Sequence, residues 1–376
     1  MKQQDVILGE KVVASAAPIF VTAAIVGVES ENPSLAFHLI DAAAECGADA
    51  VRFRTRRSEG VGAAGDSVLR SAAGDVTIGG SVLPWDDQVR LKQHAESQGV
   101  IFLSTPLDEE SADFLDQLGV SALCVTSGDL THTRLLRHIA SKEKPVFLST
   151  GMSYLNEVAD AVWTLRSGGA DGIVLMHSVG SRPADPALLN LRSLQTLSNH
   201  FNLLVGFADH SDGILYSITA AALGASVIEK HLALGFGGTA TRDRAAVTPS
   251  DLRLLVRDLK GVKLSWGDGR KRPVAPEETA RVRERRSVVA AVDIRAFERL
   301  RPWMLACKPP GSGLAPGKID KLLGTHARRD IAKGTMLRWD DLNYSAHCGP
   351  EEILAGDAVT EDDAGAALAD AGGGLR

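Results

Sequence analysis

The stretch "FNLLVGFADHSDGILYSITAAALGASVIEKHLAL" (residues 201–234) holds two short apolar runs, 203–207 and 227–231, on either side of a helical segment of small residues. A strand, a helix and a second strand in this order form a βα repeat, which builds a parallel sheet. The same alternation of short apolar runs and longer helical patterns extends from residue 19 to about residue 263. The sequence therefore predicts repeated βα units over most of the chain.

The number of strand candidates decides the architecture. One alternative is a doubly wound open sheet, and another is a barrel with one strand wrongly assigned, but eight similar units over roughly 250 residues favour a closed (β/α)8 TIM barrel. The active site of such a barrel lies at the carboxyl ends of its strands. The predicted strands are 19–26, 50–53, 100–104, 122–125, 146–149, 172–177, 203–207 and 227–231.

Composition limits the classes of function. Of 376 residues, 44% are hydrophobic and 23% charged, and the net charge of −6 argues against a nucleic-acid-binding surface, so an anionic small molecule would need a locally basic pocket. The four cysteines form no close pair, which excludes a disulfide framework or zinc knuckle. No apolar run reaches the roughly 18 residues of a membrane span. We expect a soluble cytoplasmic protein.

The pattern changes after Trp266. We expect the barrel to occupy residues 1–268, a charged, proline-containing linker leading into a short helix to occupy 269–284, a small β-rich domain to occupy 285–345, and a disordered tail to occupy 346–376. The Gly-, Ala- and Ser-rich segment 56–84 is either an active-site loop or a partly mobile insertion.

Two histidines, His210 and His231, end the last two predicted strands. Neutral imidazoles at neighbouring strand ends suit Mn²⁺, Co²⁺, Fe²⁺ or Zn²⁺, with water or substrate in the open positions. The alternative is that each histidine caps its strand by hydrogen bonding. Asp209 and Glu229 adjoin them in sequence, and either one is placed to orient an imidazole or a substrate.

The chain resembles the sialic acid synthase family, whose members carry a barrel followed by a small antifreeze-like (SAF) domain. The resemblance rests on motifs in matching order and spacing over residues 18–345. They are "FLSTP" (102–106), "SGD" (127–129), "PVFLSTGM" (145–152), "DH" (209–210), "GASVIEKH" (224–231), "RRSVVAA" (285–291), "PGSG" (310–313) and "ARRDIAKGTMLRWDDL" (327–342).

This resemblance implies a reaction. Family members condense phosphoenolpyruvate with the open-chain aldehyde of a hexosamine to give a 2-keto-3-deoxy acid and phosphate. A divalent metal, Mn²⁺ or Mg²⁺, is held by the residues that match His210 and His231 and acts as a Lewis acid on the aldehyde. A homodimer, in which the SAF domain of one subunit covers the barrel of the other, is also implied.

The remaining predicted site residues end other strands or follow them. We expect Asp129, Glu229 and His177 to act in catalysis or to position substrate. For the anionic donor we expect Arg52, Thr105, Ser127 and Ser149. The further predicted substrate-binding residues are Arg54, Thr150, Asp209 and Asp243.

Several positions depart from the family pattern. Ile25 and Ser30 replace a glutamate and a histidine after the first strand, Cys124 replaces a lysine, and Pro309 replaces the arginine that reads an N-acetyl group. Cys124 is either a nucleophile or a passive buried thiol. Arginines absent from the pattern either rebuild an anion site or are surface charges; they are Arg54, Arg182 and Arg242.

These departures leave two further hypotheses beside the condensation reaction. The scaffold has been diverted to a metal-dependent aldolase or lyase reaction that does not use phosphoenolpyruvate, or the protein is a non-catalytic homologue that serves as a binding partner.

Overall fold

We describe the protein from a computed structural model. It describes residues 3–25, 33–56, 83–234 and 243–343, together with the backbone of 68–71 and 74–77. The chain divides into two compact units, Met1–Asp268 and Gly269–Arg376, which are described separately.

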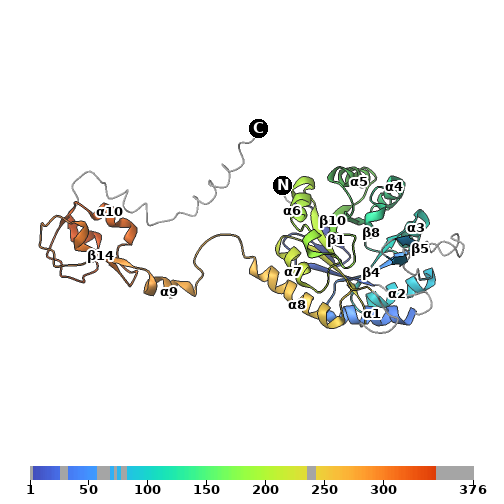
Figure 1. Ribbon diagram of the computed structural model, residues 1–376, viewed down its shortest axis with the longest axis horizontal. Coiled ribbons are helices and arrows are strands. Elements are labelled where there is room, and N and C mark those ends of the chain that lie inside the picture. Colours follow the sequence, from blue (N-terminus) through green and yellow to red (C-terminus); the bar gives the residue numbers. More distant parts are fainter. Residues whose placement is uncertain are drawn as a thin grey trace. The chain divides into compact units, whose positions relative to one another are not determined.

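The first unit is built on a closed barrel of parallel strands (Figure 1). Each strand pairs with its neighbours in parallel, and the barrel closes where Val227 of the last strand pairs with Phe20 of the first. The predicted (β/α)8 barrel is confirmed. Its eight strands in the described residues are β3 (Phe20–Ile25), β4 (Ala50–Thr55), β7 (Ile101–Pro106), β8 (Leu123–Val125), β9 (Pro145–Ser149), β10 (Gly172–Ser178), β11 (Leu204–Asp209) and β12 (Val227–Leu232).

Helices surround these strands (Figure 1). Local sequence determines where they begin: at α8, Thr248 accepts a hydrogen bond from the Asp251 amide, and Pro249 occupies the first turn, where its missing N–H costs nothing. The helices are α1 (Pro33–Cys46), α2 (Trp85–Ser97), α3 (Glu109–Gln117), α4 (Thr133–Ala140), α5 (Leu155–Ser167), α6 (Ser193–Phe201), α7 (Leu215–Ala222) and α8 (Pro249–Ser265).

Alternation along each strand separates two environments. On β4, Val51 and Phe53 belong to the core between barrel and helices, whereas Ala50 belongs to the core inside the barrel. Arg52 and Arg54 follow Ala50 at intervals of two, so they face the interior near the carboxyl end. The strands thus place apolar residues low in the barrel and polar ones at its mouth.

An N-terminal hairpin, β1 (Val6–Leu8) and β2 (Lys11–Val13), packs against the barrel interior. Its buried Val6 lies close to Gly172, where an added Cβ would be only 3.1 Å from a Val6 methyl. Because Gly172 begins β10, the hairpin covers the amino end of the barrel. The sequence did not predict this hairpin, since strands of three residues leave no clear alternation.

Another hairpin, β5 (Val68–Ser71) and β6 (Gly74–Thr77), lies within the segment 56–84, for which the sequence left a choice between an active-site loop and a partly mobile insertion. The rest of this segment, apart from its ends, lies outside the described residues.

The second unit begins with α9 (Glu277–Glu284), which occupies the later part of the predicted linker. A small apolar core that includes Val288, Ile294 and Leu337 joins two antiparallel pairs of strands. Its elements are β13 (Ser287–Ala290), β14 (Leu305–Lys308), α10 (Ile319–Leu322), β15 (His326–Ala327) and β16 (Leu342–Asn343). The predicted disordered tail, 346–376, lies outside the described residues.

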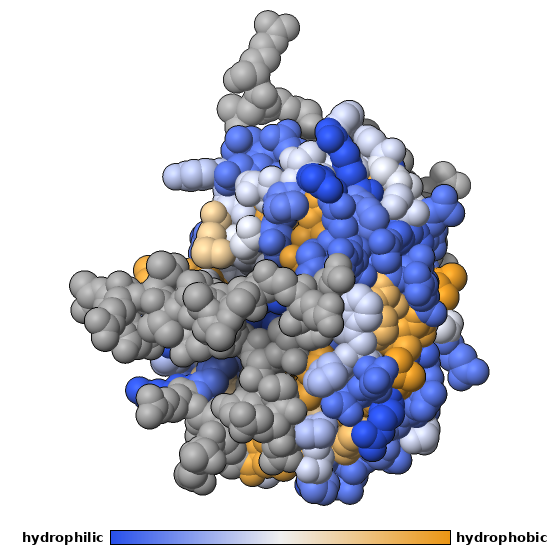
Figure 2. All heavy atoms as spheres, turned by 90° about the vertical axis from the view of Figure 1, so that its right-hand side faces the viewer, coloured by the Kyte–Doolittle hydropathy of each residue, from blue (hydrophilic) through white to orange (hydrophobic). Residues whose placement is uncertain are grey.

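The side of the barrel unit shown in Figure 2 is mostly hydrophilic, with scattered hydrophobic patches, as is usual for a protein surface in water. None of the helices in the described parts of the chain combines the length and apolar character that a membrane crossing requires.

Candidate active site

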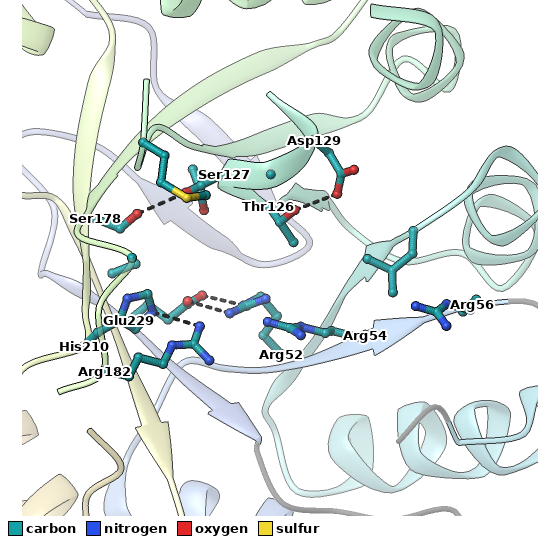
Figure 3. Close-up of a pocket in the computed structure, with 16 residues that line it drawn as sticks. Arg52, Arg54, Arg56, Thr126, Ser127, Asp129, Ser178, Arg182, His210 and Glu229 are labelled. Atoms are coloured by element: carbon teal, nitrogen blue, oxygen red, sulfur yellow. Dashed lines mark hydrogen bonds and ion pairs between the residues drawn. The ribbon is translucent and has the colours of Figure 1, made fainter. Parts of the chain in front are cut away.

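A cavity of about 440 Å³ opens at the carboxyl ends of the barrel strands (Figure 3). This is the place where the βα architecture puts active sites. Most of its lining comes from the last residue or two of a strand and from the loop that follows. The lining residues are Arg52, Arg54, Arg56, Leu107, Thr126, Ser127, Gly128, Asp129, Ser149, Met152, Ser178, Gly180, Arg182, Ala208, His210 and Glu229.

A two-point ion pair between Arg52 and Glu229 crosses the cavity floor (Figure 3). Arg52 donates from Nε and from one terminal nitrogen to the two carboxylate oxygens, each at 2.7 Å, and its other terminal nitrogen donates to Thr105 Oγ1 at 3.1 Å. Burial by itself would raise the pKa of Glu229, but the charge and hydrogen bonds of Arg52 outweigh it and lower that pKa. Glu229 is therefore held as a carboxylate.

The two predicted metal ligands are brought together. The ring centroids of His210 and His231 lie 5.1 Å apart. His210 Nδ1 donates to the Val179 carbonyl at 2.8 Å, and His231 Nδ1 donates to Asp243 Oδ2 at 2.6 Å. Because a carbonyl and an ionised carboxylate only accept hydrogen bonds, each Nδ1 carries the proton. Each Nε2 then carries a lone pair, and that of His210 accepts a hydrogen bond from Arg182 at 3.4 Å.

Both imidazoles are neutral at pH 7. Burial lowers the pKa of His210 to about 4, with further lowering from His231 and Arg182. Burial also lowers the pKa of His231, although the hydrogen bond that it donates to Asp243 opposes the shift. Burial raises the pKa of the Asp243 carboxyl, but the hydrogen bonds from His231 and the Ala245 amide, together with nearby positive charge, lower it to about 2.

This donor set fits a divalent metal. Two neutral Nε2 lone pairs, each fixed by an acceptor on the far ring nitrogen, are what first-row divalent ions bind. In the described residues no group of three or more His, Cys, Asp and Glu side chains is arranged to hold a metal. Water or substrate oxygen would fill the other positions. A terminal nitrogen of Arg182 lies 3.4 Å from His210 Nε2 and would have to move aside.

Hydroxyl groups form the opposite side of the cavity. The 3-10 turn η1 (Ser127–Asp129) follows β8 and presents Ser127, whose Oγ accepts a hydrogen bond from the Gly151 amide at 3.0 Å and lies 3.2 Å from Ser178 Oγ. A Cβ at Gly151 would approach these two hydroxyls to 2.8 and 2.7 Å, so only glycine fits there. Asp129 accepts a hydrogen bond from Thr126 Oγ1 at 2.6 Å.

Six predicted site residues are not among those that line the cavity, namely Thr105, Thr150, His177, Asp209, His231 and Asp243. His177 stacks on Phe207 and its Nε2 is 2.8 Å from the Leu189 carbonyl. The Thr150 hydroxyl donates to the Met176 carbonyl at 3.3 Å. Asp243 contacts His231 and the Ala245 amide, so it positions a histidine and is not part of the cavity wall.

Asp209 does not line the cavity. It is 0% exposed, and its carboxylate accepts hydrogen bonds from the Ser211 amide and hydroxyl and from the Ser217 hydroxyl. The ammonium group of Lys230, equally buried, lies 3.2 Å from it and donates to the Ser211 carbonyl at 2.6 Å. This fully buried ion pair joins β11 to β12.

Some cavity residues were not predicted as site residues, above all Ser178, Thr126 and Arg56. The predicted sixth strand ended at His177, one residue too early. On β10 the residues that face the interior are Val174 and Met176, whereas Ile173 and Leu175 face the helices. The same alternation assigns Ser178 to the cavity and His177 to the outside, so the signal was present in the sequence.

The departures from the family pattern fall in different places. Ile25 ends β3 and is half-buried, and Pro309 belongs to the second unit. Ser30 and Arg242 lie outside the described residues. Arg182 lines the cavity, as do Gly180 and Ala208.

Cys124 is buried inside the barrel below Arg52. Burial raises its pKa to about 12, and the charge of Arg52 only partly opposes this. The thiol therefore remains protonated at neutral pH, which favours the passive alternative over a nucleophile.

Thiol labelling checks this interpretation. In native protein at pH 8 we expect iodoacetamide to leave Cys124 unmodified, because the thiolate is the reactive form, while the half-buried Cys307 reacts. Peptide mapping by mass spectrometry measures both sites, and labelling in denaturant shows that the Cys124 peptide is detectable. Rapid native labelling of Cys124 would contradict its assignment as passive.

Both units of the chain are similar to known protein families. Residues 39–271 match the NeuB family, and residues 285–343 match the SAF domain. An uncharacterised protein of Methanocaldococcus jannaschii is 32% identical over 335 residues, covering 89% of this chain and 98% of that protein. The N,N'-diacetyllegionaminic acid synthase of Legionella pneumophila is 33% identical, covering 82% and 90%.

A solved structure of a sialic acid synthetase is similar to this chain. The N-acetylneuraminic acid (sialic acid) synthetase of Leptospira borgpetersenii, crystallised in complex with citrate, is 26% identical with a TM-score of 0.66, covering 74% of this chain and 95% of that one. The predicted SAF domain, which follows the barrel in the sequence, is therefore confirmed. With its barrel, its strand-end histidines and its SAF domain, the chain belongs to the NeuB family of sialic-acid-synthase-like enzymes, which form carbon–carbon bonds in sugar-acid synthesis.

Proposed function

We propose that the protein condenses phosphoenolpyruvate with an open-chain sugar or sugar-like aldehyde to give a 2-keto-3-deoxy acid and phosphate, with the help of a divalent metal. The observation that carries the proposal is the pair of neutral Nε2 lone pairs of His210 and His231 beside a cavity lined by arginines and hydroxyls. The relatives named as sialic and legionaminic acid synthases support it.

The chain's own groups suit an anionic donor. Ser127 and Ser149 offer hydroxyls to phosphate or carboxylate oxygens, and the Arg52 guanidinium, braced by Thr105, adds positive charge. Arg52 is already balanced by Glu229, so its net contribution to anion binding is small until a ligand displaces that carboxylate. The donor therefore depends on further cations of the cavity.

At the acceptor side, His210 and His231 would hold Mn²⁺ or Mg²⁺ through Nε2; Co²⁺, Fe²⁺ or Zn²⁺ also suit imidazole. When bound, this ion supplies Lewis acidity to the aldehyde oxygen. Asp243 keeps the proton of His231 on Nδ1. Asp129 accepts from Thr126 through Oδ2, and its Oδ1 has no hydrogen-bond partner among the described residues, which leaves it available for a sugar hydroxyl.

The loops at the cavity end of the barrel support the homodimer part of the proposal. They expose large apolar side chains: Met152 is 75% and Tyr154 79% exposed after β9, and Leu188 and Leu215 are each more than 60% exposed after β10 and β11. A partner subunit's SAF domain would cover such a surface. The described cysteines are free thiols, which agrees with the proposed cytoplasmic location.

The test of function is turnover. Metal-loaded protein is incubated with phosphoenolpyruvate and a panel of aldoses, and phosphate release and a new 2-keto acid are measured together. We expect both products in equal amounts with at least one aldose, and neither after chelation. Absence of turnover with every aldose, together with no phosphoenolpyruvate binding by calorimetry, contradicts the proposal.

One observation favours a second candidate, a metal-dependent aldolase or lyase that does not use phosphoenolpyruvate. Cys124, neutral and buried, stands where the family has a lysine, so a fixed positive charge for the donor is missing there. Cleavage of a 2-keto-3-deoxy acid to an aldehyde and pyruvate, without phosphate release, distinguishes this candidate.

A further inference from the structure

Arg54 and Arg182 line the cavity without an ion-pair partner in the part of the chain that the structure describes. Among the described residues no acidic side chain forms an ion pair with either guanidinium, and the one hydrogen-bond contact of Arg182 is with His210 Nε2. Arg52, in contrast, donates hydrogen bonds from three nitrogens, two to Glu229 and one to Thr105. Of these three arginines, Arg52 forms an ion pair with a carboxylate, and Arg54 and Arg182, the unbalanced arginines, form none among the described residues.

Both unbalanced arginines are fixed in place by the barrel. Arg54 lies on β4 and pairs in register with Thr105 of β7. The segment that carries Arg182 is tied to the end of β11, because the Ala184 amide donates to the His210 carbonyl at 2.8 Å. In Figure 3 the Arg54 side chain lies beside Arg52, and the Arg182 side chain lies beside Glu229 and His210. These contacts fix the backbone of both residues; the side chain of Arg54 is half-buried, and that of Arg182 is exposed at the cavity mouth.

We propose that Arg54 and Arg182 form a second anion site, which binds a carboxylate or phosphate group of a substrate; this rests on the proposed function. Like charges gathered in a partly enclosed cavity are unfavourable unless an anion joins them. Burial lowers the pKa of Arg54 to about 10, and the positive charges of Arg52 and Arg182 add to this shift. The low pKa of Arg54 thus agrees with several like charges lying close together in the cavity. The planar guanidinium fork matches the two-oxygen edge of a carboxylate or phosphate.

Two sources supply such a group. One is the donor, whose phosphate lacks the lysine that Cys124 replaces. The other is an acidic group on the acceptor, such as the carboxylate of a uronic acid or the phosphate of a sugar phosphate. Arg182 adjoins His210, the proposed acceptor side, and Arg54 adjoins Arg52, the proposed donor side, so the site borders both.

The experiment measures binding without turnover. Calorimetry with inorganic phosphate, with phosphoenolpyruvate and with acidic and neutral aldoses is carried out on wild type, Arg54→Gln, Arg182→Gln and the double variant. We expect each single variant to weaken phosphate binding about tenfold or more, because a charge-assisted hydrogen bond is lost. Arg257→Gln, on the exposed face of α8, is the matched control and keeps wild-type affinity.

The choice of ligands distinguishes whether the bound anionic group belongs to the donor or to the acceptor. If the donor occupies the site, affinity for phosphoenolpyruvate falls with affinity for phosphate; if the acceptor does, acidic aldoses lose affinity while neutral aldoses keep theirs. Arg54→Lys and Arg182→Lys keep the charge without the fork, and we expect partial recovery. Variants that bind every anion within about twofold of wild type, or a wild type that binds none, overturn the proposal. Phosphate binding is independent of turnover, so an inactive wild type that still binds phosphate through Arg54 and Arg182 contradicts only the proposed function.

Discussion

His210→Ala and His231→Ala are each expected to lower turnover about 10²- to 10³-fold, because each removes one of the two protein lone pairs that hold the metal. The metal content, measured by elemental analysis after gel filtration, is expected to fall from one ion per chain to none. Circular dichroism checks that both variants remain folded.

Two further variants are expected to lose less metal affinity than these or none. Asp243→Asn keeps both Nε2 atoms but weakens the acceptor that fixes the His231 proton, so we expect metal affinity to fall about 10- to 100-fold without loss of the site. His177→Ala removes a histidine that lies outside the cavity, and we expect it to keep the metal. A full complement of metal in His210→Ala or His231→Ala contradicts the assignment.

Lys230→Met is expected to lower the free energy of unfolding by about 3 to 5 kcal/mol, because it leaves the Asp209 carboxylate buried without its counterion. Both side chains are 0% exposed, so water does not replace the lost partner. Urea unfolding followed by fluorescence measures the change.

The control is an ion pair at the surface. Lys11 and Asp49 lie 2.8 Å apart with side chains 34% and 28% exposed, and we expect Lys11→Met to cost less than about 1 kcal/mol. In the double variant Asp209→Asn with Lys230→Met, no unpaired charge remains, so a part of the stability returns. Equal losses for Lys230→Met and Lys11→Met would show that the buried pair is not needed.

Much of the candidate site was predictable because barrels place their chemistry at strand ends. The period of apolar runs predicted where the strands end, and so placed Arg52, Ser127 and Glu229 at one mouth. Residue type then indicated the two histidines as a pair, and their ring centroids do lie 5.1 Å apart. These predictions did not require knowledge of any contact between distant residues.

Three of the predicted site residues lie outside the cavity lining for one physical reason. Barrel strands are buried on both faces, so β10 is apolar from Gly172 to Met176 and its hydrophobicity does not say which residues face inward. Asp209, His177 and Thr150 all fall on the outward face, beside Phe207, Leu175 and Leu148. The alternation would have separated them once a single inward residue was known.

By itself, then, the sequence determined the barrel, the strand ends and the residue types gathered there, because these follow from local period and chain order. Only the tertiary structure decided which groups pair across the interior. Arg52 and Glu229 lie 177 residues apart, and their ion pair holds Glu229 as a carboxylate and leaves Arg54 and Arg182 with no ion pair among the described residues. Such pairings depend on the register of distant strands, which local sequence does not encode.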